Sequence, residues 1–205
     1  VKSQWPDVQL DGLHMHIGSQ LLSLDPVREA LQRMAAFWRE LESAGHAIAS
    51  IDVGGGLGVR YREGEQAPDA NEYAAAIREA LAGFKGRILV EPGRWLVAEA
   101  GILLSRVLLE KQGEARRFLV LDAAMNDLLR PSLYEAWHDI VRVSGDANAQ
   151  RVLYDVVGPV CETGDTFAVA RELPRCEAGD LVAILGAGAY GASMASTYNS
   201  RPLAA

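Results

Sequence analysis

The stretch Ile51-Asp52-Val53-Gly54-Gly55-Gly56-Leu57-Gly58 decides the fold. A short apolar run, typical of a buried strand, leads directly into three consecutive glycines. A tight turn would by itself account for glycine here, although one turn rarely uses three in a row. Backbone N–H groups without side chains approach an anion closely, so the stretch favours a strand that ends in an anion-binding loop.

Two further strands are predicted outside this one. Strand composition is found at Leu10–Ile17 and Arg87–Val90. The strand that leads into the glycines, Ile48–Val53, lies between them in the sequence. An amphipathic helix is predicted in each gap. The first has Asp25 as its N-cap and ends before Gly45. The second starts with a capping box of Asp69 and Glu72. Their apolar stripes are Val27, Leu31, Met34, Trp38 and Leu41, then Tyr73, Ile77, Leu81 and Phe84.

This alternation of strands and helices predicts parallel strands joined by helical crossovers. Parallel strands all point one way, so the segments that follow them meet at one face. Those segments are His16–Ser19, Gly54–Gly58 and Glu91–Arg94. Function concentrates on that face in α/β barrels and in open α/β sheets, so we expect the site there.

The second half has a different pattern, with short strands and no long helices between them. We expect an antiparallel β domain, a helical turn within Asn126–Tyr134 and a boundary near residue 99, which gives domains 1–99 and 100–205. The strands expected here are Gly101–Glu110, Arg117–Leu121, His138–Val143, Val152–Val157 and Asp180–Leu185.

Composition excludes several classes of function. The chain has 205 residues, 49% of them hydrophobic, and a net charge of −7, and its longest basic run is Arg116-Arg117, which argues against nucleic-acid binding. The apolar run Gly101–Leu109 contains Ser105 and Arg106, so no membrane span is expected. Two cysteines make no disulfide framework, and a reducing cytoplasm is the expected compartment.

Gly186-Ala-Gly-Ala-Tyr-Gly191 matches the glycine spacing of a dinucleotide-binding loop. That loop needs a βαβ unit and an acidic residue about 20 positions later. Asp180 is the last acidic residue of the chain, and Ser196–Pro202 is a poor helix former. We therefore do not expect a dinucleotide site.

Seven motifs together resemble the fold-type III, pyridoxal-phosphate-dependent decarboxylases of basic amino acids, and within them the diaminopimelate decarboxylases. They occur in the family's order over nearly the whole chain. The motifs are His14–Gln20, Asp52–Gly58, Glu91–Arg94, Met125–Tyr134, Cys161–Asp165, Gly188–Gly191 and Tyr198–Pro202.

The resemblance implies an α/β plus all-β fold. Residues 1–99 would form the last three strands of a pyridoxal-phosphate-binding (β/α)8 barrel of the alanine-racemase type, and an antiparallel β-barrel or sandwich would follow. Three strands cannot close an eight-stranded barrel, so roughly 150 barrel residues would lie upstream.

The resemblance also implies a pyridoxal 5'-phosphate site. Ligands of the phosphate would be Ser19, Gly54, Gly55, Gly56, Gly93, Arg94 and Tyr190. Backbone N–H groups, a guanidinium and hydroxyls suit a phosphate dianion. Glu91 would meet the pyridine nitrogen and His16 would pack on the ring. Taken alone, His16 is more typical of a strand histidine with a structural role, and Glu91 and Arg94 could simply pair with each other. We expect no metal site.

The substrate implied is meso-2,6-diaminopimelate, which would be converted to L-lysine and CO2. Arg130 and Tyr134, four residues apart, would hold the distal carboxylate together with Arg94, and Tyr190 would also contact the substrate. Glu162 would meet the distal ammonium. A lone Arg130 would more often be a solvated surface residue.

Cys161 is implied to protonate the α-carbon in a neighbouring subunit's site, which implies a homodimer. With His16 and Glu91 it completes the expected catalytic set. Cys176 is expected to be a buried apolar residue.

The sequence departs from the family in three places. Thr163 stands where serine is usual, and Ala123-Ala124 where Ala-Gly is usual. The lysine that carries the cofactor is missing, because none of Lys2, Lys85 and Lys111 lies in that motif. Two alternatives stay open: a related decarboxylase whose substrate has a distal carboxylate, and a non-catalytic homologue that acts as a binding partner.

Overall fold

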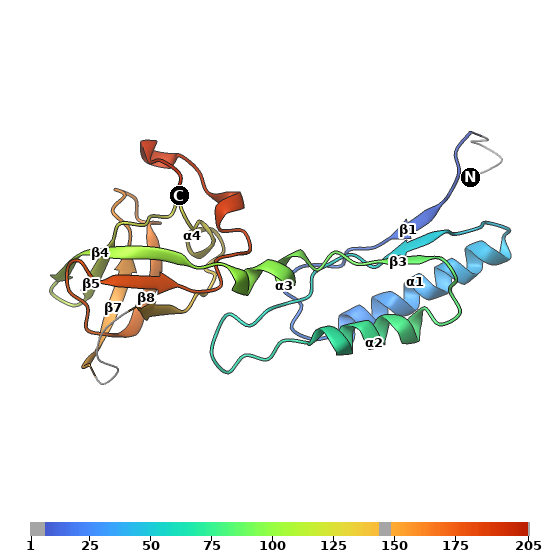
Figure 1. Cartoon of the computed structure of the whole chain (residues 1–205), viewed down its shortest axis with the longest axis horizontal. Coiled ribbons are helices and arrows are strands. Elements are labelled where there is room, and N and C mark those ends of the chain that lie inside the picture. Colours follow the sequence, from blue (N-terminus) through green and yellow to red (C-terminus); the bar gives the residue numbers. More distant parts are fainter. Residues whose placement is uncertain (1–6, 144–148, 205) are drawn as a thin grey trace. The chain divides into compact units, whose positions relative to one another are not determined.

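The structure, a computed structural model, describes residues 7–143 and 149–204. Lys2 lies outside these residues. The chain forms two compact units, Val1–Arg60 with Glu65–Trp95, and Tyr61–Gly64 with Leu96–Ala205. Each unit is described by itself (Figure 1). Among the described residues, no helix is long and apolar enough to span a membrane.

The first unit contains a three-stranded parallel sheet of order β1-β2-β3, as the alternation of strands and helices predicts. Leu13 pairs with Ile51, and Ile51 with Ile88, across the three strands. The elements are β1 (Gly12–His14), α1 (Asp25–Ser43), β2 (Ser50–Asp52), α2 (Ala70–Ala80) and β3 (Arg87–Leu89), followed by α3 (Gly93–Val97). The strands are shorter than predicted, because only three residues of each one pair with a neighbouring strand.

Both long helices bury their apolar stripes on this sheet. Leu31 of α1, Ile77 of α2 and Ile51 of β2 belong to one core, in which Leu31 and Ile51 are fully buried. Trp38 meets Phe84 edge to face, with ring centroids 5.1 Å apart. Each fully buried side chain of this kind contributes roughly 1.5–3 kcal/mol relative to an exposed one. The periodicity of the sequence thus identified the helix faces correctly.

The two predicted helix starts have different outcomes. Asp69 is confirmed as an N-cap, because its carboxylate accepts hydrogen bonds from the N–H groups of Asn71 (2.6 Å) and Glu72 (2.8 Å). Asp25 is not the N-cap of α1, because it is the helix's first residue and follows the N-cap Leu24, which makes no side-chain cap. Gly45, with φ +82°, follows the end of α1 as predicted.

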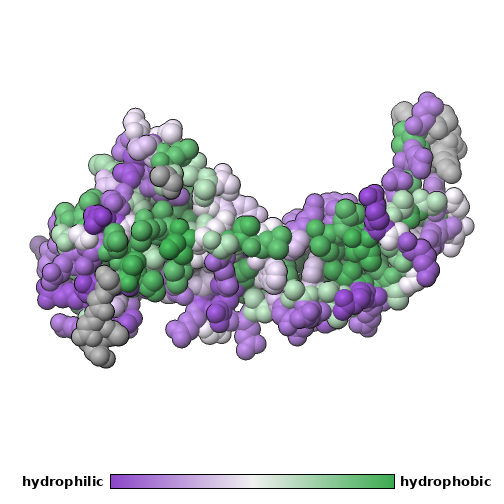
Figure 2. Space-filling view, viewed as in Figure 1, coloured by the Kyte–Doolittle hydropathy of each residue, from purple (hydrophilic) through white to green (hydrophobic). Residues whose placement is uncertain are grey.

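β3 is exposed along its length. Ile88, Leu89 and Val90 are 40–47% exposed despite being apolar. Figure 2 shows apolar surface over the part of the first unit where Figure 1 draws this strand. Consecutive side chains of a strand point to opposite faces, so β3, an edge strand of this sheet, is uncovered on both faces within the first unit.

The second unit contains a six-stranded sheet of order β6-β9-β4-β5-β7-β8. The edge strands β6 and β8 also contact each other, so the sheet is a nearly closed barrel. Its strands are β4 (Leu103–Gln112), β5 (Arg117–Leu121), β6 (Ile140–Arg142), β7 (Arg151–Val157), β8 (Thr166–Pro174) and β9 (Leu181–Ile184). The short helices are α4 (Arg130–Tyr134), η1 (Ala98–Ala100), η2 (Ala192–Met194) and η3 (Tyr198–Ser200). The α/β plus all-β fold class is confirmed.

Two features of this sheet differ from the expectation. β5 and β7 pair in parallel, with Leu119 opposite Val156, because α4 and β6 return the chain between them. β8 was not predicted. Its apolar residues do not alternate regularly, and Ala170, with φ +48°, interrupts its extended backbone.

The core of the second unit lies inside the barrel and includes Tyr154 and Cys176, both 0% exposed. The Tyr154 hydroxyl donates to a Glu110 carboxylate oxygen (3.3 Å) and accepts from the Cys176 N–H (3.3 Å). Burial raises the pKa of the Cys176 thiol. Cys176 is thus the buried apolar residue that the sequence predicts, whereas Cys161 is exposed.

Gly54, Gly55 and Gly56 follow β2 and lie beside the segments that follow β1 and β3. A Cβ on Gly54 would collide with the carbonyl oxygen of Met15, one on Gly55 with that of Glu91, and one on Gly56 with that of Gly18. Gly54 and Gly56 also have positive φ, +70° and +94°. The backbones of three segments are in direct contact here, and this contact alone requires glycine.

The two cysteines should differ in reactivity. We expect a water-soluble disulfide reagent to modify Cys161 in the folded chain and to reach Cys176 only on unfolding, because thiolate formation needs solvent. A Cys161→Ser variant should therefore titrate no fast thiol before urea is added. Fast modification of Cys176 in that variant would contradict the core assignment.

Gly56 and Gly83 form a matched pair for the packing of the strand exits. Both have positive φ, +94° and +91°, but an added Cβ on Gly83 meets nothing within 4 Å. Gly83→Ala should lower the free energy of unfolding by about 1–2 kcal/mol, the cost of left-handed backbone. Gly56→Ala should cost at least about 3 kcal/mol, because backbone atoms must also move. Urea denaturation followed by circular dichroism measures both, and equal losses would refute the packing argument.

Candidate functional site

The three strand exits of the first unit are joined by hydrogen bonds. Gly55 N–H lies 3.3 Å from the Nδ1 of His16, which accepts its hydrogen bond. Glu91 N–H donates to the carbonyl of Gly54 at 2.8 Å. The predicted site segments of this half therefore lie side by side.

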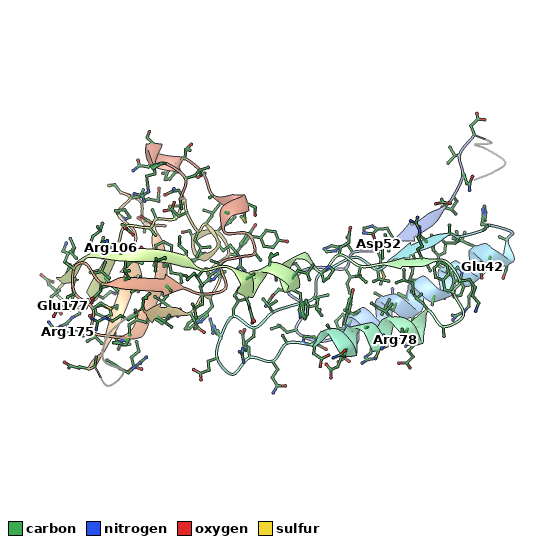
Figure 3. The ribbon with its side chains drawn as sticks, viewed as in Figure 1. Glu42, Asp52, Arg78, Arg106, Arg175 and Glu177 are labelled. Carbon is green, nitrogen blue, oxygen red and sulfur yellow. The ribbon has the colours of Figure 1, made fainter. Side chains whose placement is uncertain are left out.

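Two backbone N–H groups of the glycine loop already donate hydrogen bonds within the first unit. Gly54 N–H donates to Asp52 Oδ1 at 2.9 Å, and Gly55 N–H is bound to His16. Asp52 lies at the end of β2, where Figure 3 labels it. The predicted role of these glycines in binding an anion stays a prediction, since packing already accounts for their lack of side chains.

Ser19 and Arg94 come together although 75 residues separate them. An Arg94 Nη2 donates to the Ser19 hydroxyl at 3.1 Å. Gly93, next to Arg94, is exposed, and a Cβ added there would meet nothing within 4 Å. A guanidinium, a hydroxyl and open space beside them form the part of the first unit best suited to an oxyanion.

Glu91 lies at the exit of β3 with its carboxylate 3.5 Å from the Nε2 of His14. His14, Asp52 and Glu91 have donor atoms within 4.8 Å of one another. His14 and Glu91 are exposed, and both side chains are 56% accessible. Exposed groups of this kind do not by themselves make a metal site, and we propose none.

In the second unit, α4 carries both predicted substrate residues. Arg130, its first residue, is only 6% exposed, whereas Tyr134, its last, is 63% exposed. An Arg130 Nη1 lies 2.8 Å from the Nε2 of His138. Its guanidinium carbon lies 4.5 Å from the centroid of the Tyr61 ring. Arg130 is thus not the solvated surface arginine that the residue alone suggests.

The loop that carries Cys161 and Glu162 is held by a buried carboxylate. Asp165, 3% exposed, accepts hydrogen bonds at 2.7 Å from the N–H groups of Met125 and Val160. Burial raises the pKa of Asp165, while these two hydrogen bonds oppose the shift. Asp165 therefore ties the Cys161 loop to the segment that leads into α4, and Cys161 and Glu162 are both exposed.

The motif near the C-terminus is tied to the same segments. Arg201 donates to Asn126 Oδ1 at 2.8 Å and to the Asp122 carbonyl at 2.6 Å. The Tyr198 hydroxyl donates to a Glu162 carboxylate oxygen at 3.2 Å, and this bond raises the pKa of Tyr198. Motifs that are far apart in the sequence are thus in contact within the second unit.

The Gly186–Gly191 segment does not form a dinucleotide site. It follows β9 and continues as turns into η2, with no βαβ unit. A Cβ on Gly188 would collide with the Val97 carbonyl, and one on Gly191 with that of Ala187. Close backbone packing thus accounts for the lack of side chains at Gly188 and Gly191. Tyr190 has φ +62° and is 44% exposed.

Two residues that lie at the predicted sites are not among the predicted site residues. Asp165 was part of a recognised motif but had no role assigned, and His138 was placed only in a strand. The helical step from Arg130 to Tyr134 does not extend to His138, because the chain leaves the helix at Glu135, which has φ +52°. No local pattern pairs His138 with Arg130.

The residues of the first unit fit a phosphorylated pyridine cofactor. Ser19 and Arg94 offer adjacent donors to a phosphate beside the open space at Gly93. Glu91, whose carboxylate is exposed, and His16 both form hydrogen bonds with the glycine loop. Tyr190 belongs to the other unit, and its contribution stays a prediction.

Comparison with known proteins identifies the family. Residues 15–188 match the family described as "Pyridoxal-dependent decarboxylase, C-terminal sheet domain". The chain is 49% identical over 204 residues to diaminopimelate decarboxylase of Zymomonas mobilis, covering 99% of this chain and 48% of that protein. The chain thus spans about half the length of the curated relatives it matches.

Solved structures agree. A crystal structure of diaminopimelate decarboxylase from Helicobacter pylori complexed with L-lysine has a TM-score of 0.89 and 48% identity, over 95% of this chain and 48% of that one. A lysine/ornithine decarboxylase from Vibrio vulnificus complexed with cadaverine has a TM-score of 0.88 and 25% identity, over 99% and 55% of the two chains. The chain therefore belongs to the pyridoxal-dependent decarboxylases, and the part it contains includes their C-terminal sheet domain.

Proposed function

We propose that this chain is the C-terminal half of a decarboxylase that converts meso-2,6-diaminopimelate to L-lysine and CO2. The observation that carries the proposal is the buried guanidinium of Arg130, which is oriented by His138 and Tyr61. A substrate with a carboxylate at its distal end needs such a group, since a planar guanidinium binds a carboxylate through two parallel hydrogen bonds. Ornithine and lysine have no carboxylate at that end.

The other substrate residues in this unit suit the distal carbon. Tyr134, four residues after Arg130 on α4, offers a hydroxyl to the same carboxylate. Glu162 is exposed on the loop that Asp165 holds, and its charge suits the distal ammonium. In this proposal Arg94 and Tyr190 contact the substrate as well. The set recognises both charges of the distal carbon.

The first unit would hold pyridoxal 5'-phosphate. Ser19, Gly93 and Arg94 would bind its phosphate, with Gly54–Gly56 and Tyr190, while Glu91 would face the ring nitrogen and His16 the ring. The bound cofactor supplies an electron-accepting ring for the decarboxylation. The carboxylate of Glu91 would keep a proton on the ring nitrogen, and the close backbone packing at the glycines would keep the strand exits rigid.

The uncovered β3 supports the proposed barrel. Its apolar side chains are exposed in the first unit, and strands of a (β/α)8 barrel are covered on both faces. We propose that further barrel strands of the full-length protein cover them. The lysine that carries the cofactor is expected on those strands, so residues 1–205 alone should be inactive.

Full-length protein should release CO2 from meso-diaminopimelate, and residues 1–205 alone should not. Arg130→Ala should lower kcat/KM for diaminopimelate on the order of a hundredfold, since charge-assisted hydrogen bonds to the distal carboxylate are lost. Tyr134→Phe, at an exposed position, should raise KM about threefold to tenfold through loss of one hydrogen bond. Radiometric CO2 release measures all four proteins.

The preference for diaminopimelate over lysine as a substrate separates binding from folding. Partial unfolding lowers turnover of both compounds alike, whereas loss of the carboxylate site abolishes only the preference. A wild-type enzyme that releases no CO2 from diaminopimelate would refute the proposed reaction. A preference that survives Arg130→Ala would show that Arg130 does not hold the distal carboxylate, and the argument for the substrate would fail.

We also propose a homodimer in which Cys161 protonates the α-carbon in the partner's site. The thiol supports this, because it is exposed to solvent in its own unit. Mixing inactive Glu91→Ala and Cys161→Ala proteins should restore about a quarter of wild-type activity, since half the dimers are hybrids with one intact site. Activity measured after subunit exchange checks this. If the mixture stays inactive while hybrid dimers form, Cys161 acts within its own subunit.

A further inference from the structure

Two basic side chains of the second unit, Arg130 and His138, are in direct contact. The atoms Nη1 and Nε2 lie 2.8 Å apart, and the two residues are 6% and 1% exposed. An arginine only donates hydrogen bonds. The imidazole must therefore accept at Nε2, which requires an unprotonated nitrogen there.

The other ring nitrogen fixes this tautomer. Nδ1 of His138 lies 2.8 Å from the carbonyl oxygen of Leu185, which directly follows β9. A carbonyl only accepts, so Nδ1 carries the proton and Nε2 keeps its lone pair. The Leu185 N–H donates to the Asp139 carbonyl at 2.8 Å, which holds Leu185 beside the His138 backbone. The sheet thus sets the direction of the imidazole lone pair.

Tyr61 restricts the same guanidinium from a second direction. The Arg130 guanidinium lies over the Tyr61 ring, and that ring meets His138 edge to face at 5.3 Å. Tyr61 in turn packs against Gly186, where an added Cβ would lie 3.3 Å from the ring. The guanidinium is thus held by the Tyr61 ring and by the hydrogen bond to the imidazole.

We propose that His138 is a positioning residue for the distal carboxylate of the substrate. It accepts one hydrogen bond from Arg130 and so turns a fixed edge of the guanidinium towards the ligand. This inference rests on the proposed function and adds a residue outside the predicted substrate set. Fixing the guanidinium before binding removes much of the entropy cost of ordering a long side chain.

The chemistry of histidine suits this role better than that of an acid. Aspartate or glutamate at this position would also accept from Arg130, but its negative charge would compete with the ligand carboxylate for the guanidinium. A neutral imidazole orients the guanidinium without adding a negative charge beside it.

Two substitutions separate this role from a structural one. In His138→Asn, the side-chain amide takes the place of Nδ1 and still donates to Leu185, but it does not reach Arg130. In His138→Gln, the amide reaches the place of Nε2 and offers Arg130 an acceptor. Both variants are polar and smaller than histidine, so they act as controls for each other.

The readout is the affinity of the full-length holoenzyme for L-lysine and for cadaverine, by calorimetry. The two ligands differ only in one carboxylate. We expect His138→Asn to weaken L-lysine binding about tenfold, to leave cadaverine binding unchanged and to raise KM for diaminopimelate more than it lowers kcat. His138→Gln should recover most of the L-lysine affinity, to within about threefold of wild type.

Two results would overturn the proposal. In the first, His138→Asn keeps the wild-type ratio of L-lysine affinity to cadaverine affinity, whereas Arg130→Ala lowers that ratio. The other is equal loss of both ligands in both His138 variants together with a lowered melting temperature, which marks a purely structural residue. If Arg130→Ala itself keeps the wild-type ratio, the proposed substrate site fails and the role of His138 fails with it.

Discussion

The close contact of three backbone segments at Gly54–Gly56 is the constraint on which the first unit depends. The carbonyls of Met15, Gly18 and Glu91 occupy the space where side chains would otherwise lie. This contact brings the exits of all three parallel strands together, and with them His16, Ser19, Glu91 and Arg94. The same glycines that would expose N–H groups to an anion are thus required first by packing. The fold and the candidate site therefore both require glycine at these positions.

The second unit is held together differently at its site, because its site residues lie on loops around a nearly closed sheet. Buried polar side chains hold these loops where main-chain pairing does not. Asp165 joins the Cys161 loop to Met125, and Arg201 joins the chain's last segment to Asn126. His138 fixes Arg130 in the same way. Each partner is buried or half-buried, so an unpaired member would carry a large desolvation penalty.

Local sequence predicted the elements wherever periodicity or capping was strong. The stripes of α1 and α2, the cap at Asp69 and the strand β5 follow from residues close together in the chain. Asp25 was assigned wrongly because a carboxylate before Pro26 suits either the N-cap or the first turn. β8 was missed because its apolar pattern is irregular. The parallel pairing of β5 with β7 depends on how the intervening chain returns, which local patterns do not encode.

By itself, the sequence determined the alternation of strands and long helices in the first unit, the glycine requirement and, through seven motifs in order, the family. Those features are short-range or compositional, so they are visible along the chain. Only the tertiary structure decided that Arg130 is buried, that His138 faces it in a single tautomer and that Asp165 binds two separate segments. These are contacts between residues that burial brings together, and their energies depend on desolvation, which no local pattern records.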